Sequence, residues 1–255
     1  MDISIWQIVI ILVAGVAGGF INTLAGAGSF IMLAALEMAG LSGSMANGTS
    51  RVAIQAQNIM AVLGFRSKGL SNFRMSLQFA IPALIGAVLG AYIIIELPEV
   101  VFHRVLGAAM VLMLVVLAVN PNKWFKGHRV EFTPRRRIVG YLIFFALGVY
   151  GGAIQAAVGI LLMAGLVLFA GMNLVETNMH KVFIVGIYTI FALATFALRG
   201  EVNWLLGLVL AVGNGLGGWI GSRMAVEKGE NMVRGVLAVT LAVLALRYLG
   251  IVQFF

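Results

Sequence analysis

Residues 14–29 read AGVAGGFINTLAGAGS, and residues 147–159 read LGVYGGAIQAAVG. Both stretches interrupt apolar runs that are too long for one pass through a bilayer, because a spanning helix needs only about 20 residues. Aligned without gaps, the two stretches place Gly15 opposite Gly148, Gly26 opposite Gly159, and Asn22 opposite Gln155. These matches predict two homologous halves, each opening with a helix that is broken by glycine.

The composition excludes a water-soluble domain. Hydrophobic residues make up 62% of the 255 positions and charged residues only 10%, whereas soluble domains carry about 25% charged residues. We therefore expect an all-α integral membrane protein. Apolar runs lie at about 5–38, 44–65, 75–95, 100–119, 138–170, 178–198, 203–222 and 232–250. If the two longest runs are each a pair of short segments, the chain has ten membrane segments rather than eight.

The order of the matches predicts a membrane repeat at 1–119, a basic linker at 120–137 and a second membrane repeat at 138–255. Twelve of the 17 basic residues lie in 66–74, in the linker or in 223–234. Inverted repeats place all three segments in the cytoplasm, as the positive-inside rule requires, whereas parallel repeats leave 223–234 outside. The charge pattern therefore favours inverted repeats in a multi-pass protein of the inner (plasma) membrane.

Polar side chains gather in the run 44–65. They are Asn47, Thr49, Ser50, Arg51, Gln55, Gln57 and Asn58. Helical spacing puts four of them on one face: Asn47, Arg51, Gln55 and Asn58. A guanidinium among amides and hydroxyls suits an oxyanion, and Lys181 stands at the position of Arg51 in the second half. The alternative is that Arg51 lies at the membrane edge while the amides bond to neighbouring helices.

The first glycine break offers a second set of candidates. Gly28 and Ser29, preceded by Asn22, could direct backbone N–H groups and a helix N-terminus at an anion. Gln155 is the matching polar residue of the second break, and Thr177 precedes Lys181 by one helical turn. Alternatively, the glycines serve only close packing or a kink.

Acidic residues are scarce, and none forms a pair deep in an apolar run. Glu37, Glu176 and His180 are the candidates for proton coupling. The chain has no cysteine, and its three histidines are far apart, so we expect neither a metal site nor a cofactor. We expect no enzyme either, since no catalytic constellation is present. The net charge of +8 lies mostly in short loops, which argues against nucleic acid as a partner.

These features together resemble the sulfite exporter TauE/SafE family, also known as the TSUP permeases. The resemblance rests on the break at 18–29 and on the segments ANGTSR at 46–51, TNMHK at 177–181 and RGEVNW at 199–204, with the glycines of 213–221. It covers nearly the whole chain, although relatives usually have more glycine than this chain has at 151–159. The resemblance implies a permease for a small sulfur-containing anion such as sulfite, thiosulfate or an organosulfonate, with Arg51 and Lys181 as the basic positions.

The expected partners are a small anionic substrate and the lipid bilayer, with a homodimer as an option. One alternative function is a permease for another small solute, in which Arg51 and Lys181 are merely structural. Another is a scaffold that transports nothing. The polar face of the run 44–65 argues against a scaffold.

Overall fold

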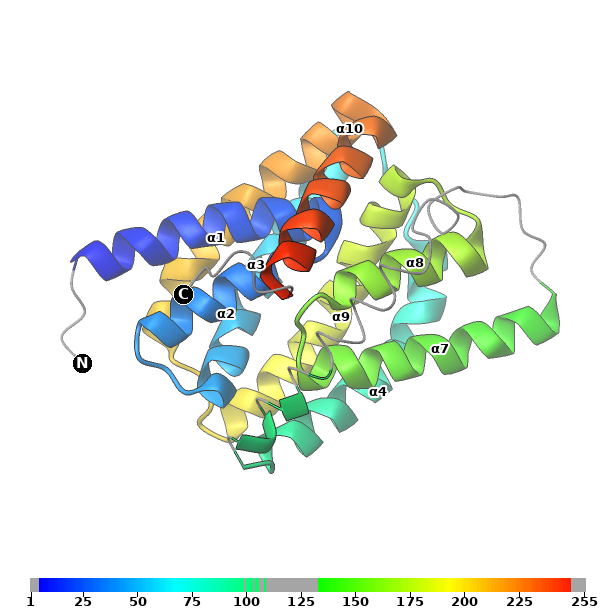
Figure 1. Ribbon diagram of the computed structural model, residues 1–255. Helices are drawn as coiled ribbons and strands as arrows, with labels where there is room; N and C mark the ends of the chain where they lie inside the picture. The colour runs from blue at the N-terminus through cyan, green and yellow to red at the C-terminus, as the bar shows by residue number, and fades with distance from the viewer. Residues whose placement is uncertain (1–4, 99, 103, 106–107, 109–132, 249–255) are drawn as a thin grey trace.

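The structure, a computed structural model, describes residues 5–98, 100–102, 104–105, 108 and 133–248. Within these residues every regular element is a helix, which confirms the all-α prediction (Figure 1). The helices are α1 (Ile5–Ala25), α2 (Ser29–Met38), α3 (Gly43–Ser67), α4 (Arg74–Ile95), α7 (Pro134–Ala153), α8 (Val158–Ala170), α9 (Leu174–Leu198) and α10 (Trp204–Tyr248). Most of the run expected at 100–119 and of the linker at 120–137 lies outside the described residues. The last four linker residues, 134–137, belong to α7.

Four helices in the described part of the chain are long and apolar enough to cross a bilayer: Ile5–Ala25, Arg74–Ile95, Leu174–Leu198 and Trp204–Thr240. Helix α3 has 25 residues, but its polar side chains lower its hydropathy. Those side chains avoid lipid because α3 is enclosed by α9, α10 and the first broken pair. Several membrane-spanning helices in one chain make it a multi-pass membrane protein.

Both expected breaks are present, but they are built differently. Helix α1 ends at Ala25, and the following Gly26 has a φ of 78°, in the left-handed region that glycine tolerates. Helix α7 runs through its glycines to Ala153, and the second break is made by Gln155 and Ala157, with φ of 63° and 54°. The second break is therefore not a glycine break, which corrects that expectation. After each break a short helix, α2 or α8, turns back toward the side from which the first helix came (Figure 1).

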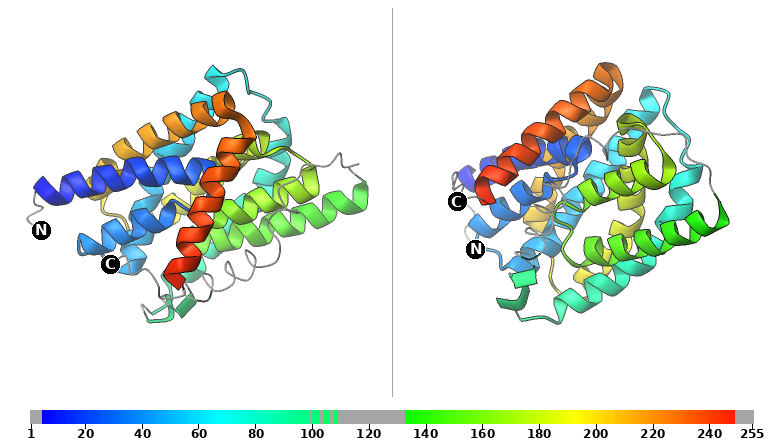
Figure 2. Two further views of the ribbon diagram at one scale, coloured as in Figure 1. Left: turned by 45° about the horizontal axis from the view of Figure 1, so that its top comes forward. Right: turned by 45° about the vertical axis from the view of Figure 1, so that its right-hand side comes forward.

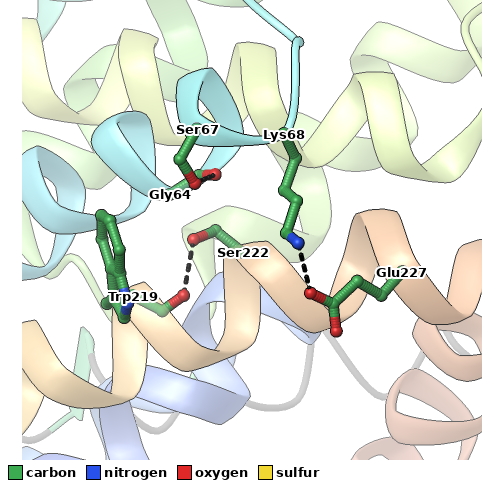
Figure 3. Close-up of polar contacts among 6 residues, drawn as sticks. All are labelled: Gly64, Ser67, Lys68, Trp219, Ser222 and Glu227. Carbon is green, nitrogen blue, oxygen red and sulfur yellow. Dashed lines mark hydrogen bonds and ion pairs between the residues drawn. The ribbon is translucent and has the colours of Figure 1, made fainter.

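Helices α1, α3 and the first part of α10 run parallel to one another. Glycines allow their backbones to touch, since a Cβ at several of these positions would overlap the neighbouring helix. The contacts that define the directions are Leu12–Gly213 and Val16–Gly217 between α1 and α10, and Val52–Gly207 and Gly64–Ser222 between α3 and α10. Figure 3 shows Gly64 and Ser222 on their two helices. At Gly229, with φ of 71°, α10 bends sharply, and its last part crosses the molecule (Figure 2).

Helices α4, α7 and α9 form a second parallel group. Their directions follow from the contacts Ala83–Gly148 and Ala87–Gly152 between α4 and α7, and Ser76–His180 and Tyr92–Arg199 between α4 and α9. The two groups are antiparallel to each other, because the start of α3 lies beside the end of α9, where Gly48 faces Phe196. Each group thus combines helices from both halves of the chain.

The two ends of the bundle differ in charge. At one end Lys68 forms an ion pair of 2.6 Å with Glu227, joining the end of α3 to α10 (Figure 3). At the opposite end Arg199 bonds to Glu96 at 2.8 Å. The end with Lys68 carries most of the described basic residues: Arg66, Lys68, Arg74, Arg135, Arg136, Arg137, Arg223, Lys228 and Arg234.

Candidate functional site

Lys181 of α9 binds the end of α1. Its side chain is 2% exposed, and its Nζ donates to the backbone oxygens of Asn22 (3.0 Å) and Thr23 (2.7 Å) and to Oδ1 of Asn178 (2.7 Å). Asn178 in turn donates from Nδ2 to the backbone oxygen of Leu24. The last carbonyls of a helix have no partner within that helix, so a cation at this place satisfies them and complements the helix dipole.

Arg51 of α3 does the same for the end of α7. It is fully buried, and its guanidinium donates to the backbone oxygens of Gly151 and Gly152. Asn47 adds a bond of 2.6 Å from Nδ2 to the backbone oxygen of Ala153. The guanidinium also lies 4.5 Å from the ring centroid of Phe196. Each half of the chain therefore supplies the cation for the broken helix of the other half.

Neither buried cation has a carboxylate partner in the described part of the chain. Ion pairs between other described residues lie at helix ends or beside the bend of α10, far from both breaks in sequence. A helix C-terminus offers the equivalent of only about half a negative charge, which leaves net positive charge at the centre of the protein. A buried charge that is only partly compensated is costly unless a further anion binds.

The two breaks meet at the centre. Gly26 and Gly159, which the sequence alignment pairs, touch each other through their backbones, and a Cβ on either would overlap the other. Ser29 accepts a hydrogen bond of 3.1 Å at Oγ from the backbone N–H of Ala157. The beginnings of α2 and α8 are therefore held together.

A small polar cavity lies at this junction. Its lining consists of Asn22, Gln57, Asn58, Gln155, Val158, Gly159, Lys181 and Val185. The volume is about 10 Å³, which is room for roughly one water molecule. The cavity is closed to any larger solute in this conformation.

The polar atoms of the lining are mostly engaged with one another. Asn22 donates from Nδ2 to Oε1 of Gln57 at 2.7 Å, and Gln155 accepts at Oε1 from Arg51 and from the Tyr188 hydroxyl. Nδ2 of Asn58 is different, because it is buried and has no partner. Asn58 therefore brings to the cavity lining a donor that no protein group uses.

The structure thus brings together four of the predicted site residues, Asn22, Asn58, Gln155 and Lys181, around one cavity. Arg51 reaches the cavity only through Gln155. The other predicted residues contact the backbone or lie outside the lining: Gly28, Ser29, Asn47, Thr49, Ser50, Gln55 and Thr177. Gln57 also lines the cavity, although it belongs to the polar cluster of α3 and not to the four residues predicted to share one face.

The three candidates for proton coupling lie outside the lining. Glu37 and Glu176 are exposed near helix ends. His180 is buried, and its Nδ1 shares a short hydrogen bond with Oγ of Ser76, which ties the start of α9 to the start of α4. Among the described residues no group of three His, Cys, Asp or Glu side chains could hold a metal ion.

The family model "Sulfite exporter TauE/SafE" matches residues 11–248. The chain belongs to the TauE/SafE family. It is 27% identical to "Probable membrane transporter protein ORF9" of Sinorhizobium sp., over 98% of this chain and 95% of that one. A probable membrane transporter protein of Haemophilus influenzae is also 27% identical, over 94% and 93% of the two chains. No solved structure matches this TauE/SafE chain.

Proposed function

We propose that this TauE/SafE protein is a secondary transporter of a small sulfur-containing oxyanion such as sulfite, thiosulfate or an organosulfonate. The observation that carries the proposal is a pair of buried cations, Arg51 and Lys181, without a carboxylate partner among the described residues, beside a polar cavity between two broken helices. Bound substrate would supply the missing negative charge. The family's name supports a sulfur oxyanion, whereas the two relatives described above are named only as membrane transporters.

Within this proposal the anion binds at the cavity and meets Asn58 and Lys181. Asn58 offers an unused N–H donor, and Lys181 offers positive charge next to it. Because the cavity has room for only about one water molecule, the substrate must be admitted by a movement that separates the two breaks. Transport is driven by the substrate gradient, the membrane potential or coupled protons.

The arrangement of the helices supports inverted repeats as the basis of that movement. Suppose that α1, α3 and α10 are the repeat counterparts of α7, α9 and α4, in that order. Each helix of one group then has its counterpart in the other group, which runs in the opposite direction. The pairing of Arg51 with α7 and of Lys181 with α1 is symmetric under this exchange of counterparts. Such symmetry allows one side of the junction to open as the other closes.

We predict that the end of the bundle with Lys68 faces the cytoplasm, because it carries the excess of basic residues. The chain has no cysteine, so single cysteines can be labelled without background. Lys228→Cys should react with a membrane-impermeant maleimide only after the cells are opened. Glu96→Cys, at the other end, should react in intact cells. The reverse pattern would refute this orientation.

Asn58→Leu is the substitution that tests the proposed site. A hydrogen bond to a charged group contributes about 1.5–3 kcal/mol, so we expect the variant to bind the anion roughly ten- to a hundredfold more weakly. Its folding should be little affected, because Nδ2 of Asn58 has no partner to lose. The measurement is uptake of labelled sulfite, thiosulfate and an organosulfonate into reconstituted vesicles, over a range of concentrations.

Thr189→Val is the matched control. Its hydroxyl is also buried on the inside of the bundle and has no partner, but it does not line the cavity. Transport by this variant should equal that of the natural protein. Unchanged transport by Asn58→Leu would exclude the proposed site. If vesicles with the natural protein move none of the sulfur oxyanions, the substrate class is wrong.

A further inference from the structure

A second polar pocket lies on the surface, at the basic end of the bundle and away from the central cavity. It has a volume of about 300 Å³ and is lined by Asn72, Arg74, Met75, Gln78 and Arg137. Helices α4 and α7 are parallel neighbours and both begin here. Two guanidinium groups and two amides therefore surround the pocket.

The electrostatics of this pocket favour an anion. Arg74 is the first residue of α4, Arg137 lies in the first turn of α7, and neither first turn contains an acidic residue. Helix N-termini carry partial positive charge, so cations are unfavourable there and anions are favourable. Among the residues that the structure describes, no carboxylate lines the pocket to balance the two arginines. An anion between them would relieve both kinds of repulsion.

The surface next to the pocket indicates whether such an anion would belong to a lipid or to a soluble molecule. Apart from the residues of the pocket itself, the exposed side chains in the next two turns of these helices are apolar, among them Leu77, Ile81, Ile138 and Leu142. In a membrane this strip contacts acyl chains, which places the pocket at the level of the lipid headgroups. Basic pockets between membrane helices on the cytoplasmic side are suited to anionic headgroups. A soluble anion would gain nothing from the strip.

We propose that the pocket is a binding site for an anionic phospholipid. The phosphate lies between Arg74 and Arg137, the amides of Asn72 and Gln78 bond to the rest of the headgroup, and the acyl chains follow the apolar strip. The lipid joins the start of α4 to the start of α7. This site is independent of the central cavity and of the substrate that is transported.

The test uses the full-length protein in detergent, titrated with phosphatidylglycerol or phosphatidylcholine, with bound lipid counted by native mass spectrometry. The natural protein should retain phosphatidylglycerol at least tenfold more tightly than phosphatidylcholine. The double variant Arg74→Gln/Arg137→Gln should lose this preference. Arg135→Gln is the matched control, because Arg135 is in the same first turn of α7 but does not line the pocket. It should behave as the natural protein does.

Inorganic phosphate separates a lipid from a free anion. Millimolar phosphate should not displace phosphatidylglycerol, because it cannot use the apolar strip. Displacement would show a site for soluble anions and overturn the proposal. Equal retention of the two lipids, or unchanged preference in the double variant, would also overturn it. Equal melting temperatures of all variants in phosphatidylcholine would show that misfolding is not the cause.

Discussion

Replacing Gly26 with alanine is expected to destabilise the protein by roughly 2–5 kcal/mol and to abolish transport. Two costs add at this position. The left-handed backbone, with φ of 78°, is unfavourable for any residue with a Cβ, and that Cβ would overlap the backbone of Gly159 on the other broken helix. The two breaks would be forced apart and the central cavity would lose its shape. Thermal unfolding of the purified protein in detergent and uptake into vesicles measure the two effects.

Two further variants separate the two costs. Gly40→Ala introduces only the backbone strain, because Gly40 has a φ of 92° but no atom lies within 4 Å of a Cβ at this position. Gly159→Ala introduces only the steric overlap, because Gly159 has a helical backbone but its Cβ would overlap the backbone of Gly26. We expect Gly40→Ala to be mild and to transport normally, and Gly159→Ala to impair transport. If Gly159→Ala is as active as the natural protein, contact between the breaks is not required.

Replacing Lys181 with glutamine is expected to weaken anion binding as strongly as Asn58→Leu does. The substitution removes the positive charge beside the cavity, and we expect its attraction for a bound anion to match that of one charge-assisted hydrogen bond, about 1.5–3 kcal/mol. We expect a rise in the transport KM of roughly ten- to a hundredfold. Lys181 also holds the end of α1 through two backbone oxygens, so stability must be measured beside transport.

Arg51→Gln should act differently, because Arg51 does not line the cavity. It should lower the melting temperature and the maximal rate, since the end of α7 loses its connection to α3. Arg51→Lys should recover only part of the stability, because a lysine cannot reproduce the planar fork of donors. Identical effects of Arg51→Gln and Lys181→Gln on KM and on stability would contradict this division of roles.

Two local features of this region could be read from the sequence. Glycine spacing located the first break, and the alignment of the halves paired Gly26 with Gly159 and Arg51 with Lys181 before any contact was known. Such patterns can be recognised in a sequence because helix breaks and charged residues are rare within membrane-spanning segments. The contact between the two glycines, in contrast, depends on tertiary packing.

Contacts between distant segments were not predictable in the same way. Helical periodicity assigned one polar face to α3, yet Gln57 reaches the cavity from another face because protein surrounds α3 on several sides. The partners of Arg51 and Lys181 are backbone oxygens about 100 and 159 residues away in sequence, and a backbone oxygen has no sequence signature. The second break was misjudged for a related reason, since Gln155 and Ala157 are held in left-handed conformations by their surroundings.

The exchange of helices between the two parallel groups has a consequence for biogenesis. Helix α1 is synthesised long before its glycine-lined neighbour α10, and α4 is synthesised before its neighbour α7. Neither group can therefore close around the first half alone, and lipid must cover the bare glycine faces in the meantime. Helix insertion and helix association are thus separated in time, and a chain that terminates before α7 contains no complete bundle.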